Sequence, residues 1–172
     1  MKKVLLAAAL IGSTSLPALA VSHEFVQNNT NYALQDLQEW QEGSYTIPPY
    51  PQQPDWVGFY VPLKDNFKFF VDAKTLSIGS DGVIRFILRA VSASGAENIS
   101  YEGFQCPNRS MRTYAFGDAV DKMWIESTRA VWNRMNRDDQ VRMRLAEDLC
   151  PDWNPPVDAD MAIKRIKKSP WL

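Results

Sequence analysis

The chain has 172 residues, with 19 Lys and Arg against 20 Asp and Glu, two cysteines and one histidine. This length suits one domain, and the mild charge balance provides no clustered basic face of the kind that nucleic acid requires. The single imidazole, His23, lies near the start of the chain. The composition therefore argues against Ser-His-Asp and Cys-His hydrolases and against histidine-based zinc or copper sites.

The first 20 residues have the pattern of a secretory signal peptide. A lysine pair precedes an apolar run at residues 4–12, and small residues precede a cleavage position after Ala20. No cysteine follows the apolar run, which disfavours a lipoprotein anchor, and no later segment is apolar enough over the length of a bilayer span. We expect residues 1–20 to be removed and residues 21–172 to form a single exported domain.

Between the signal peptide and the central region, the sequence predicts one helix and one strand. Apolar residues spaced by three and four indicate a short amphipathic helix at residues 32–39. Residues 48–54 are rich in proline and predict an extended connector. Tyr50 packed in the core is the simpler interpretation of this connector, and docking into an aromatic groove is the alternative. Residues 55–61 have the composition of a strand, which Pro62 ends.

The region from residue 67 to residue 125 predicts an antiparallel sheet. Ile84, Phe86 and Leu88 alternate with other residues in a run from 83 to 91, which is typical of a half-buried strand. Further strand-like runs cover residues 67–72, 97–106, 109–116 and 122–125. Glycine-containing turns at residues 79–82 and 92–95 allow tight reversals of the chain.

The C-terminal part predicts two helices and a disulfide. Val141, Leu145 and Leu149 are spaced by four, which indicates a helix that begins after Asn136 or Asp138, and residues 158–168 indicate a second helix. In an exported chain without a Cys-x-x-Cys motif, Cys106 and Cys150 are expected to form a disulfide rather than act as redox or catalytic thiols.

Together these elements predict an α+β fold. It consists of a single antiparallel sheet, a meander of about five or six strands, with one N-terminal and two C-terminal helices packed on it.

A long part of the sequence is similar to a known family. The stretch from residue 69 to residue 106, followed by Arg112-Thr-Tyr-Ala-Phe-Gly117 and Trp124, resembles the cryptic neisserial protein-like family of uncharacterised exported proteins of Gram-negative bacteria. The likeness extends upstream to Trp40, Gly43 and residues 48–51, and downstream to residues 149–151. A weaker resemblance links the central strands to the surface-adhesin E domain. The resemblance implies a periplasmic location but no established activity.

We interpret the protein as a non-enzymatic module that binds an envelope protein or glycan through one face or edge of the sheet. No metal is expected, because the sequence has one histidine and both cysteines are expected to be bridged. No cofactor is expected, because neither a Gly-x-Gly-x-x-Gly motif nor a Walker loop is present. The predicted binding face consists of polar residues from the central strands and two aromatic residues: Arg85, Arg89, Asn98, Ser100, Glu102, Trp56 and Tyr60.

The alternative is a carboxylate-dependent glycan hydrolase of the cell envelope. Asp72, Glu97 and Glu102 lie on predicted strands, and two of them could act as acid and base. That chemistry requires two carboxyl groups within about 10 Å across one cleft. The distances between these carboxyl groups would therefore separate the two hypotheses.

Overall fold

The computed structural model of the protein describes residues 40–62 and 66–168. These residues lie within one compact unit that begins at Trp40. The predicted signal peptide, its cleavage after Ala20, His23 and the predicted helix at residues 32–39 lie outside the described residues. They stay predictions, as does the extent of the single domain.

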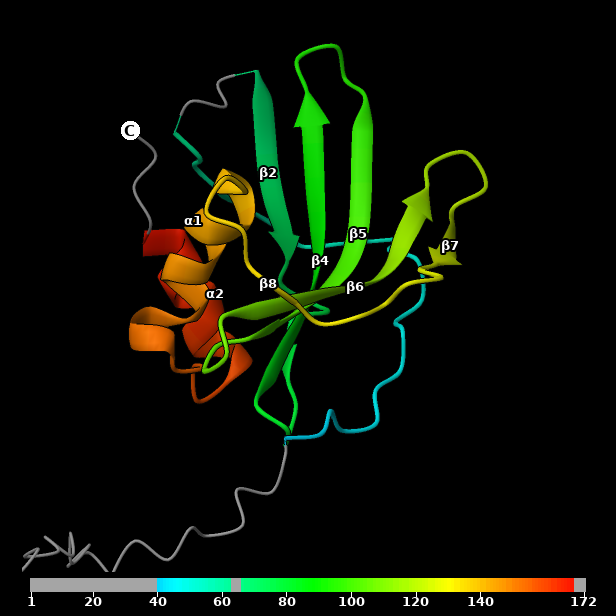
Figure 1. Ribbon diagram of the computed structural model, residues 1–172. Coiled ribbons are helices and arrows are strands. Elements are labelled where there is room, and N and C mark those ends of the chain that lie inside the picture. The colour runs from blue at the N-terminus through cyan, green and yellow to red at the C-terminus, as the bar shows by residue number, and fades with distance from the viewer. Residues whose placement is uncertain (1–39, 63–65, 169–172) are drawn as a thin grey trace, which may run out of the picture. The chain divides into compact units, whose positions relative to one another are not determined.

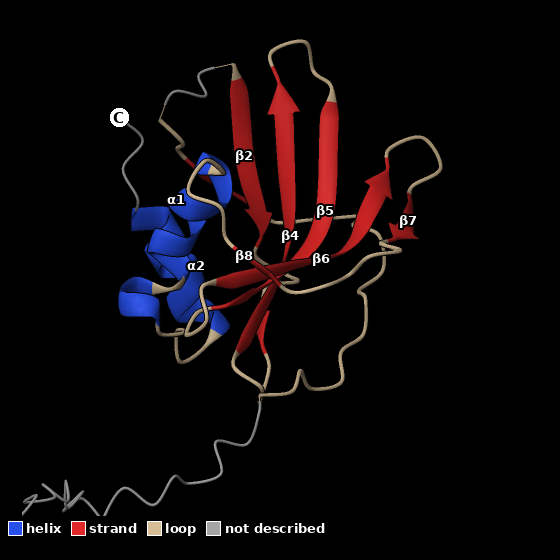
Figure 2. Cartoon of the chain, viewed as in Figure 1, coloured by secondary structure: helices blue, strands red, loops and turns tan. Residues whose placement is uncertain are grey.

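One antiparallel sheet forms the centre of the described unit (Figures 1 and 2). Its main strands neighbour each other in the order β1-β2-β4-β5-β6-β7 without a crossover, which confirms the predicted meander. These strands are β1 (Trp56–Phe59), β2 (Phe67–Asp72), β4 (Val83–Ser92), β5 (Glu97–Gln105), β6 (Ser110–Asp118) and β7 (Met123–Glu126). Two strands of two residues each, β3 (Ser77–Ile78) and β8 (Asn133–Arg134), pair with β4 and β6.

Two helices follow the sheet, as the sequence predicts: α1 (Gln140–Leu149) and α2 (Ala159–Lys168), with a short 3₁₀ turn, η1 (Pro151–Trp153), between them. The side chain of Asp139 accepts a hydrogen bond from the backbone N–H of Arg142 at 3.1 Å and caps α1. The cap is therefore Asp139 and not Asn136 or Asp138. Asp158 accepts from the backbone N–H of Met161 at 2.7 Å in the first turn of α2.

The sheet has two faces that are covered in different ways. On the helix face, alternate residues such as Ile84 and Phe86 pack with Leu145 and Leu149 of α1 and with Ile166 of α2 in one apolar core. Figure 2 shows both helices gathered on this side of the sheet. On the outer face, residues 40–54 carry neither helix nor strand and cross the sheet as an extended segment, drawn in cyan in Figure 1.

The outer face has its own smaller core. Tyr50 of the extended segment packs there with Ile87, Ile99 and Tyr101. The indole N–H of Trp124 donates to the carbonyl oxygen of Pro48 at 2.7 Å. Tyr50 is therefore a core residue, as the simpler interpretation of the proline-rich connector predicts.

A disulfide joins the sheet to the helices. Cys106 directly follows β5 and Cys150 directly follows α1, and the two Cα atoms lie 5.4 Å apart. The bond therefore connects the C-terminal helical part to the central strands, as the sequence predicts.

Candidate functional site

The polar residues predicted to form one binding face lie on opposite faces of the sheet. Residues paired across neighbouring strands share a face, and the register places Arg85 and Arg89 on the outer face but Asn98, Ser100 and Glu102 on the helix face. This corrects the prediction of one shared face. Alternation divides the residues of one strand between two faces. It does not show which residues of the next strand share each face, because the pairing register decides this.

On the helix face, Glu102 and Ser100 are covered by α1. The carboxylate of Glu102 is fully buried and accepts hydrogen bonds from Arg142 Nε at 2.9 Å, Arg142 Nη2 at 2.6 Å and Ser100 Oγ at 2.6 Å. Its oxygens are thus occupied by groups of the same chain. Glu102 is an anchor for α1 rather than a residue that a ligand could reach.

The structure does not bring together the three carboxylates proposed for acid–base catalysis. Asp72 is buried and accepts from the backbone N–H of Asp55 at 2.8 Å and from Thr75 Oγ1 at 2.9 Å, so it organises the turn after β2. Glu97 pairs with Arg89 on the outer face, opposite the face of Glu102. The sheet itself separates Glu97 from Glu102, and an acid–base pair needs both groups in one cleft.

Arg85 belongs to a buried cluster of charged and aromatic side chains centred on Glu42. Arg85 Nη2 donates to Glu42 at 2.9 Å and to Asp81 at 2.7 Å. Glu42 also accepts from Arg112, from the hydroxyl of Tyr114 and from the indole of Trp132. We call these residues the Glu42 cluster: Glu42, Asp81, Arg85, Arg112, Tyr114 and Trp132.

Hydrogen bonds hold both acids of the cluster in their charged form. Burial by itself would raise the pKa of Glu42, but donors from Tyr114, Arg85 and Trp132 outweigh it and hold the pKa below its usual value. Burial likewise opposes ionisation of Asp81, and its hydrogen bonds from Arg85 and the backbone lower its pKa. Because the side chains of Glu42, Asp81 and Arg85 are at most 10% exposed, the cluster fastens the extended segment instead of presenting a surface.

A bulge in β6 places Tyr114 in this cluster. The register between β5 and β6 shifts after Tyr101, so Tyr114 and Ala115 both contribute to the outer core although they are consecutive. The ring of Tyr114 lies directly over Gly103. A Cβ atom at position 103 would be 2.5 Å from the Tyr114 hydroxyl oxygen, so the contact requires glycine there.

An accessible hollow lies on the outer face between the extended segment and the strands, and we call it the outer groove. Its volume is about 250 Å³. The guanidinium carbon of Arg89 lies 5.3 Å from the ring centroid of Trp56 and 5.5 Å from that of Phe70. The outer groove is lined by Tyr50, Pro51, Gln52, Pro54, Trp56, Arg89, Glu97, Ile99 and Lys122.

Charges of both signs line the outer groove. Glu97 accepts a hydrogen bond from Arg89, and this bond lowers the pKa of Glu97, so the carboxylate is ionised at neutral pH. Lys122 adds a second cation and stands 6.0 Å from the centroid of the Tyr50 ring. Of the residues predicted for binding, Arg89 and Trp56 line the groove, whereas Tyr60 follows β1 and does not.

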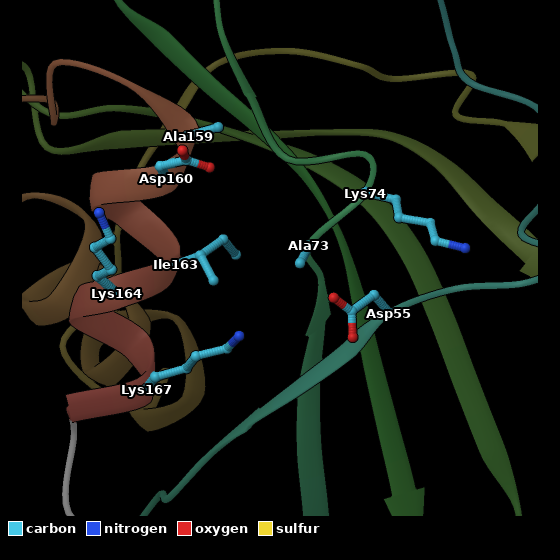
Figure 3. A pocket seen from close by; sticks show the side chains of 8 residues that line it. All are labelled: Asp55, Ala73, Lys74, Ala159, Asp160, Ile163, Lys164 and Lys167. Carbon is cyan, nitrogen blue, oxygen red and sulfur yellow. The ribbon is translucent and has the colours of Figure 1, made fainter.

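A second hollow, of about 390 Å³, lies between α2 and the start of the sheet. Figure 3 shows Ile163 and Ala73 facing each other across it, with Lys167 pointing inward and Lys164 directed away. Lys74 also points away and donates to the carbonyl oxygen of Gln53. Asp55 and Asp160 also line this hollow, so it holds charges of both signs, and it lacks the aromatic wall of the outer groove.

Comparison with known proteins matches residues 35–167 to the CNP1-like family. The chain belongs to the CNP1-like family. It is also similar to Cryptic neisserial protein 1 of Neisseria gonorrhoeae (strain ATCC 700825 / FA 1090), with 27% identity over 189 aligned positions that cover 97% of this chain and 92% of the relative. No solved structure matches the chain. The resemblance seen in the sequence is therefore confirmed.

The part that matches the CNP1-like family includes the whole Glu42 cluster and the outer groove. None of the helices at residues 40–62 and 66–168 combines the length and apolar character of a membrane span. The same residues contain no group of three or more His, Cys, Asp or Glu side chains placed to hold a metal ion.

Sequence reasoning missed two sets of residues in this CNP1-like chain. Glu42 lies in a segment without periodicity, and its partners come from distant parts of the chain, so no local pattern marks it. The one available signal was its position between Trp40 and Gly43, which both belong to the family likeness. Lys122 and the prolines of the groove wall were also missed, because the groove forms only when the extended segment lies across the sheet.

Proposed function

We propose that the protein is an exported, non-enzymatic binding module of the cell envelope whose outer groove takes one acidic sugar unit of a glycan. Membership of the CNP1-like family supplies no activity of its own, so the proposal depends on the chemistry of the groove. The observation that carries it is the placement of Trp56, Arg89, Glu97 and Lys122 around one small hollow.

The side chains of the groove match the groups of an acidic sugar. The half-buried ring of Trp56 offers apolar surface to the C–H groups of a sugar ring, and the buried ring of Tyr50 lines the same hollow. Arg89 and Lys122 are the cations that attract a sugar carboxylate, and Glu97 accepts hydrogen bonds from hydroxyl groups. Both signs of charge in one hollow therefore favour a ligand that carries an anion and several hydroxyl groups.

The size of the groove supports one sugar unit rather than a long chain. Its volume of about 250 Å³ lies just below the range of about 300–1,000 Å³ that is usual for pockets of small-molecule ligands. Among the described residues that line the groove, Glu97 is the one carboxylate, and it pairs with Arg89. Because glycoside hydrolysis ordinarily needs two carboxyl groups, this favours binding without cleavage.

The periplasmic location is part of the proposal and has its own test. Cells that express the full coding sequence are fractionated, and the N-terminus of the purified protein is sequenced. We expect a periplasmic protein that begins at Val21, because cleavage is predicted after Ala20. A cytoplasmic protein that retains its first 20 residues would contradict export.

The binding test uses the protein purified from such cells. Isothermal titration calorimetry with trigalacturonate should show binding that weakens with salt, and neutral maltotriose should bind at least about tenfold more weakly. Trp56→Ala and Arg89→Gln should each weaken trigalacturonate binding about tenfold. Lys164→Ala is the matched control, because it removes an exposed cation of α2 that lies outside the outer groove, and it should bind as the wild type does.

Two outcomes would refute the proposed ligand class. One is the absence of trigalacturonate binding by a folded wild-type protein. The other is equal weakening by Lys164→Ala and Arg89→Gln, since this would show attraction to charge in general. Thermal unfolding monitored by circular dichroism shows whether each variant is folded, and Arg89→Gln keeps the test decisive if Trp56→Ala does not fold.

A further inference from the structure

The strand β7 forms an open edge of the sheet. The backbone N–H of Ser127 donates to the carbonyl oxygen of Tyr114 at 2.8 Å, and backbone groups alternate in direction along an antiparallel strand. Residues 123, 125 and 127 thus direct their backbone groups toward β6, whereas Trp124 and Glu126 direct theirs outward. Within residues 40–62 and 66–168, no strand other than β6 pairs with β7.

The other edge of the sheet is treated differently. β1 packs against α2, through Val57 and Phe59 on the helix face of the sheet. No helix of the described unit packs against β7 in this way. An open, unshielded edge is a template for pairing with another strand.

Apolar side chains accompany this open edge. Phe116 and its partner across the strands, Ile125, are 46% and 56% exposed, and Met123 is 53% exposed. The register places these three residues on the side of the helix face, beyond the part that α1 and α2 cover. Exposed apolar residues that are neighbours in this way mark an interaction surface more often than a single exposed residue does.

The sequence of the edge is complementary to itself. It reads Lys122-Met123-Trp124-Ile125-Glu126. If a second copy pairs antiparallel about a twofold axis at Trp124, Met123 lies opposite the partner's Ile125, and Lys122 lies beside the partner's Glu126. The outward backbone groups of Trp124 can then exchange two hydrogen bonds with those of the partner's Trp124.

A shifted register loses these matches. With the axis at Ile125, Met123 would face the partner's Ser127, and Trp124 would face the partner's Glu126. Lys122 has a positive φ of 52°, so its backbone leaves the strand direction and only its side chain reaches the partner. Lys122 and Glu126 make no ion pair within the described part of the chain, and both side chains are exposed. The ammonium group of Lys122 lies 6.0 Å from the Tyr50 ring, so it would turn away from the outer groove to reach the partner's Glu126.

We propose that the occupant of this edge is a second copy of the chain, and that two β7 strands pair about Trp124 to form one continuous sheet across a homodimer. The choice of a second copy over an unrelated strand is carried by the charge complementarity between Lys122 and the partner's Glu126, which the twofold axis repeats. The Met123 contact with the partner's Ile125 covers apolar surface that is exposed in the single chain.

Charge reversal tests the register. Sedimentation equilibrium of the full mature protein should show a monomer–dimer equilibrium. Lys122→Glu and Glu126→Lys should each weaken the dimer about tenfold, because each turns two attractive cross-strand pairs into repulsive ones. An equimolar mixture of the two variants should regain the wild-type dimer, since every pair in the mixed dimer is again attractive. Lys164→Glu is the control on an exposed helix position and should leave the dimer unchanged.

Cross-linking provides a second readout that does not depend on charge. The Met123→Cys and Ile125→Cys variants are mixed, and their cysteines should form an intermolecular disulfide, because directly opposite residues of an antiparallel pair lie close enough for the bond. Each variant alone should cross-link far more slowly. A wild-type protein that stays monomeric at every concentration, or a mixture that does not cross-link, would overturn the proposal and leave the edge to a strand of another protein.

Discussion

The two faces of the sheet are stabilised in different ways. The helix face is covered by regular helices through an apolar core, and its one deeply buried carboxylate, Glu102, meets Arg142 of α1. The outer face is covered by an irregular segment that depends on the charged Glu42 cluster for its attachment. The attachment of the helices to the sheet thus depends mainly on apolar burial, whereas the attachment of the extended segment depends on ionised side chains. The two covers are expected to respond differently to mutation and to pH.

Removal of the disulfide should have the largest effect, and it acts on the helix face. Replacing both cysteines, Cys106→Ser with Cys150→Ser, opens a loop closed across 44 residues, for which the chain-entropy estimate is about 4 kcal/mol of unfolding free energy. Urea denaturation measures the loss. The wild-type protein treated with a reductant is the control and should lose a similar amount. A loss below about 1 kcal/mol would show that apolar packing alone holds the helices.

The charge pair on the helix face should respond unequally to loss of its two partners. Arg142→Met leaves the fully buried carboxylate of Glu102 with Ser100 as its remaining partner and should cost about 3 kcal/mol of unfolding free energy. Glu102→Leu should cost less, about 2 kcal/mol, because the side chain of Arg142 is 25% exposed and still pairs with Asp139.

The double variant, Glu102→Leu with Arg142→Met, sharpens the same comparison. It should be closer to the wild type than Arg142→Met alone, because an apolar pair replaces a desolvated ionic one. If the two single variants lost equal unfolding free energy, this would contradict the conclusion that the buried Glu102 needs Arg142 more than Arg142 needs Glu102.

Mutation of the Glu42 cluster on the outer face should lower the free energy of unfolding by less, and this loss should depend on pH. The folded pKa values of Glu42 and Asp81 are lowered below their ordinary values of 4.5 and 3.8. Their contribution to stability is therefore complete above those ordinary values and is lost as the pH falls through the folded pKa values. Glu42→Gln should cost about 2 kcal/mol at pH 7, since it weakens hydrogen bonds to a charged group.

This difference between wild type and Glu42→Gln should shrink as the pH falls below about 4.5, because Glu42 is then protonated in the unfolded chain, whereas in the folded protein it becomes neutral only at lower pH. Urea unfolding between pH 3 and pH 7 measures it. Glu97→Gln is the control, because Glu97 lies on the same face outside the Glu42 cluster. Its side chain is 33% exposed, so the pH-dependent difference that it shows should be smaller than that of Glu42→Gln. A cost of Glu42→Gln that is constant over this range would show that the charge of Glu42 is not what fastens the segment.

The sequence predicted those features that depend on local patterns. Alternation of apolar residues located β2, β4 and β5, and the spacing of Val141, Leu145 and Leu149 located α1. The strands β3 and β8 escaped prediction, because two residues are too few for a period.

The candidate site was predicted only in part. Arg89 and Trp56 both line the outer groove, and their role in binding stays a prediction. Glu102 and Ser100 were placed on the wrong side because the pairing register, not the pattern of one strand, decides which residues share a face. The Glu42 cluster could not be assembled, since it joins four separate stretches of the chain through tertiary contacts alone.

The extended segment has a consequence for how the outer groove would respond to its ligand. Glu42 fastens the beginning of this segment, and Tyr50, Pro51 and Pro54 further along it form one wall of the groove. A ligand that contacts this wall would bind only those protein molecules in which the extended segment is attached to the sheet. By thermodynamic linkage, the ligand would therefore favour the ionised form of Glu42. Occupancy of the groove should then extend the protein's tolerance of acid, and acidification should in turn release the ligand.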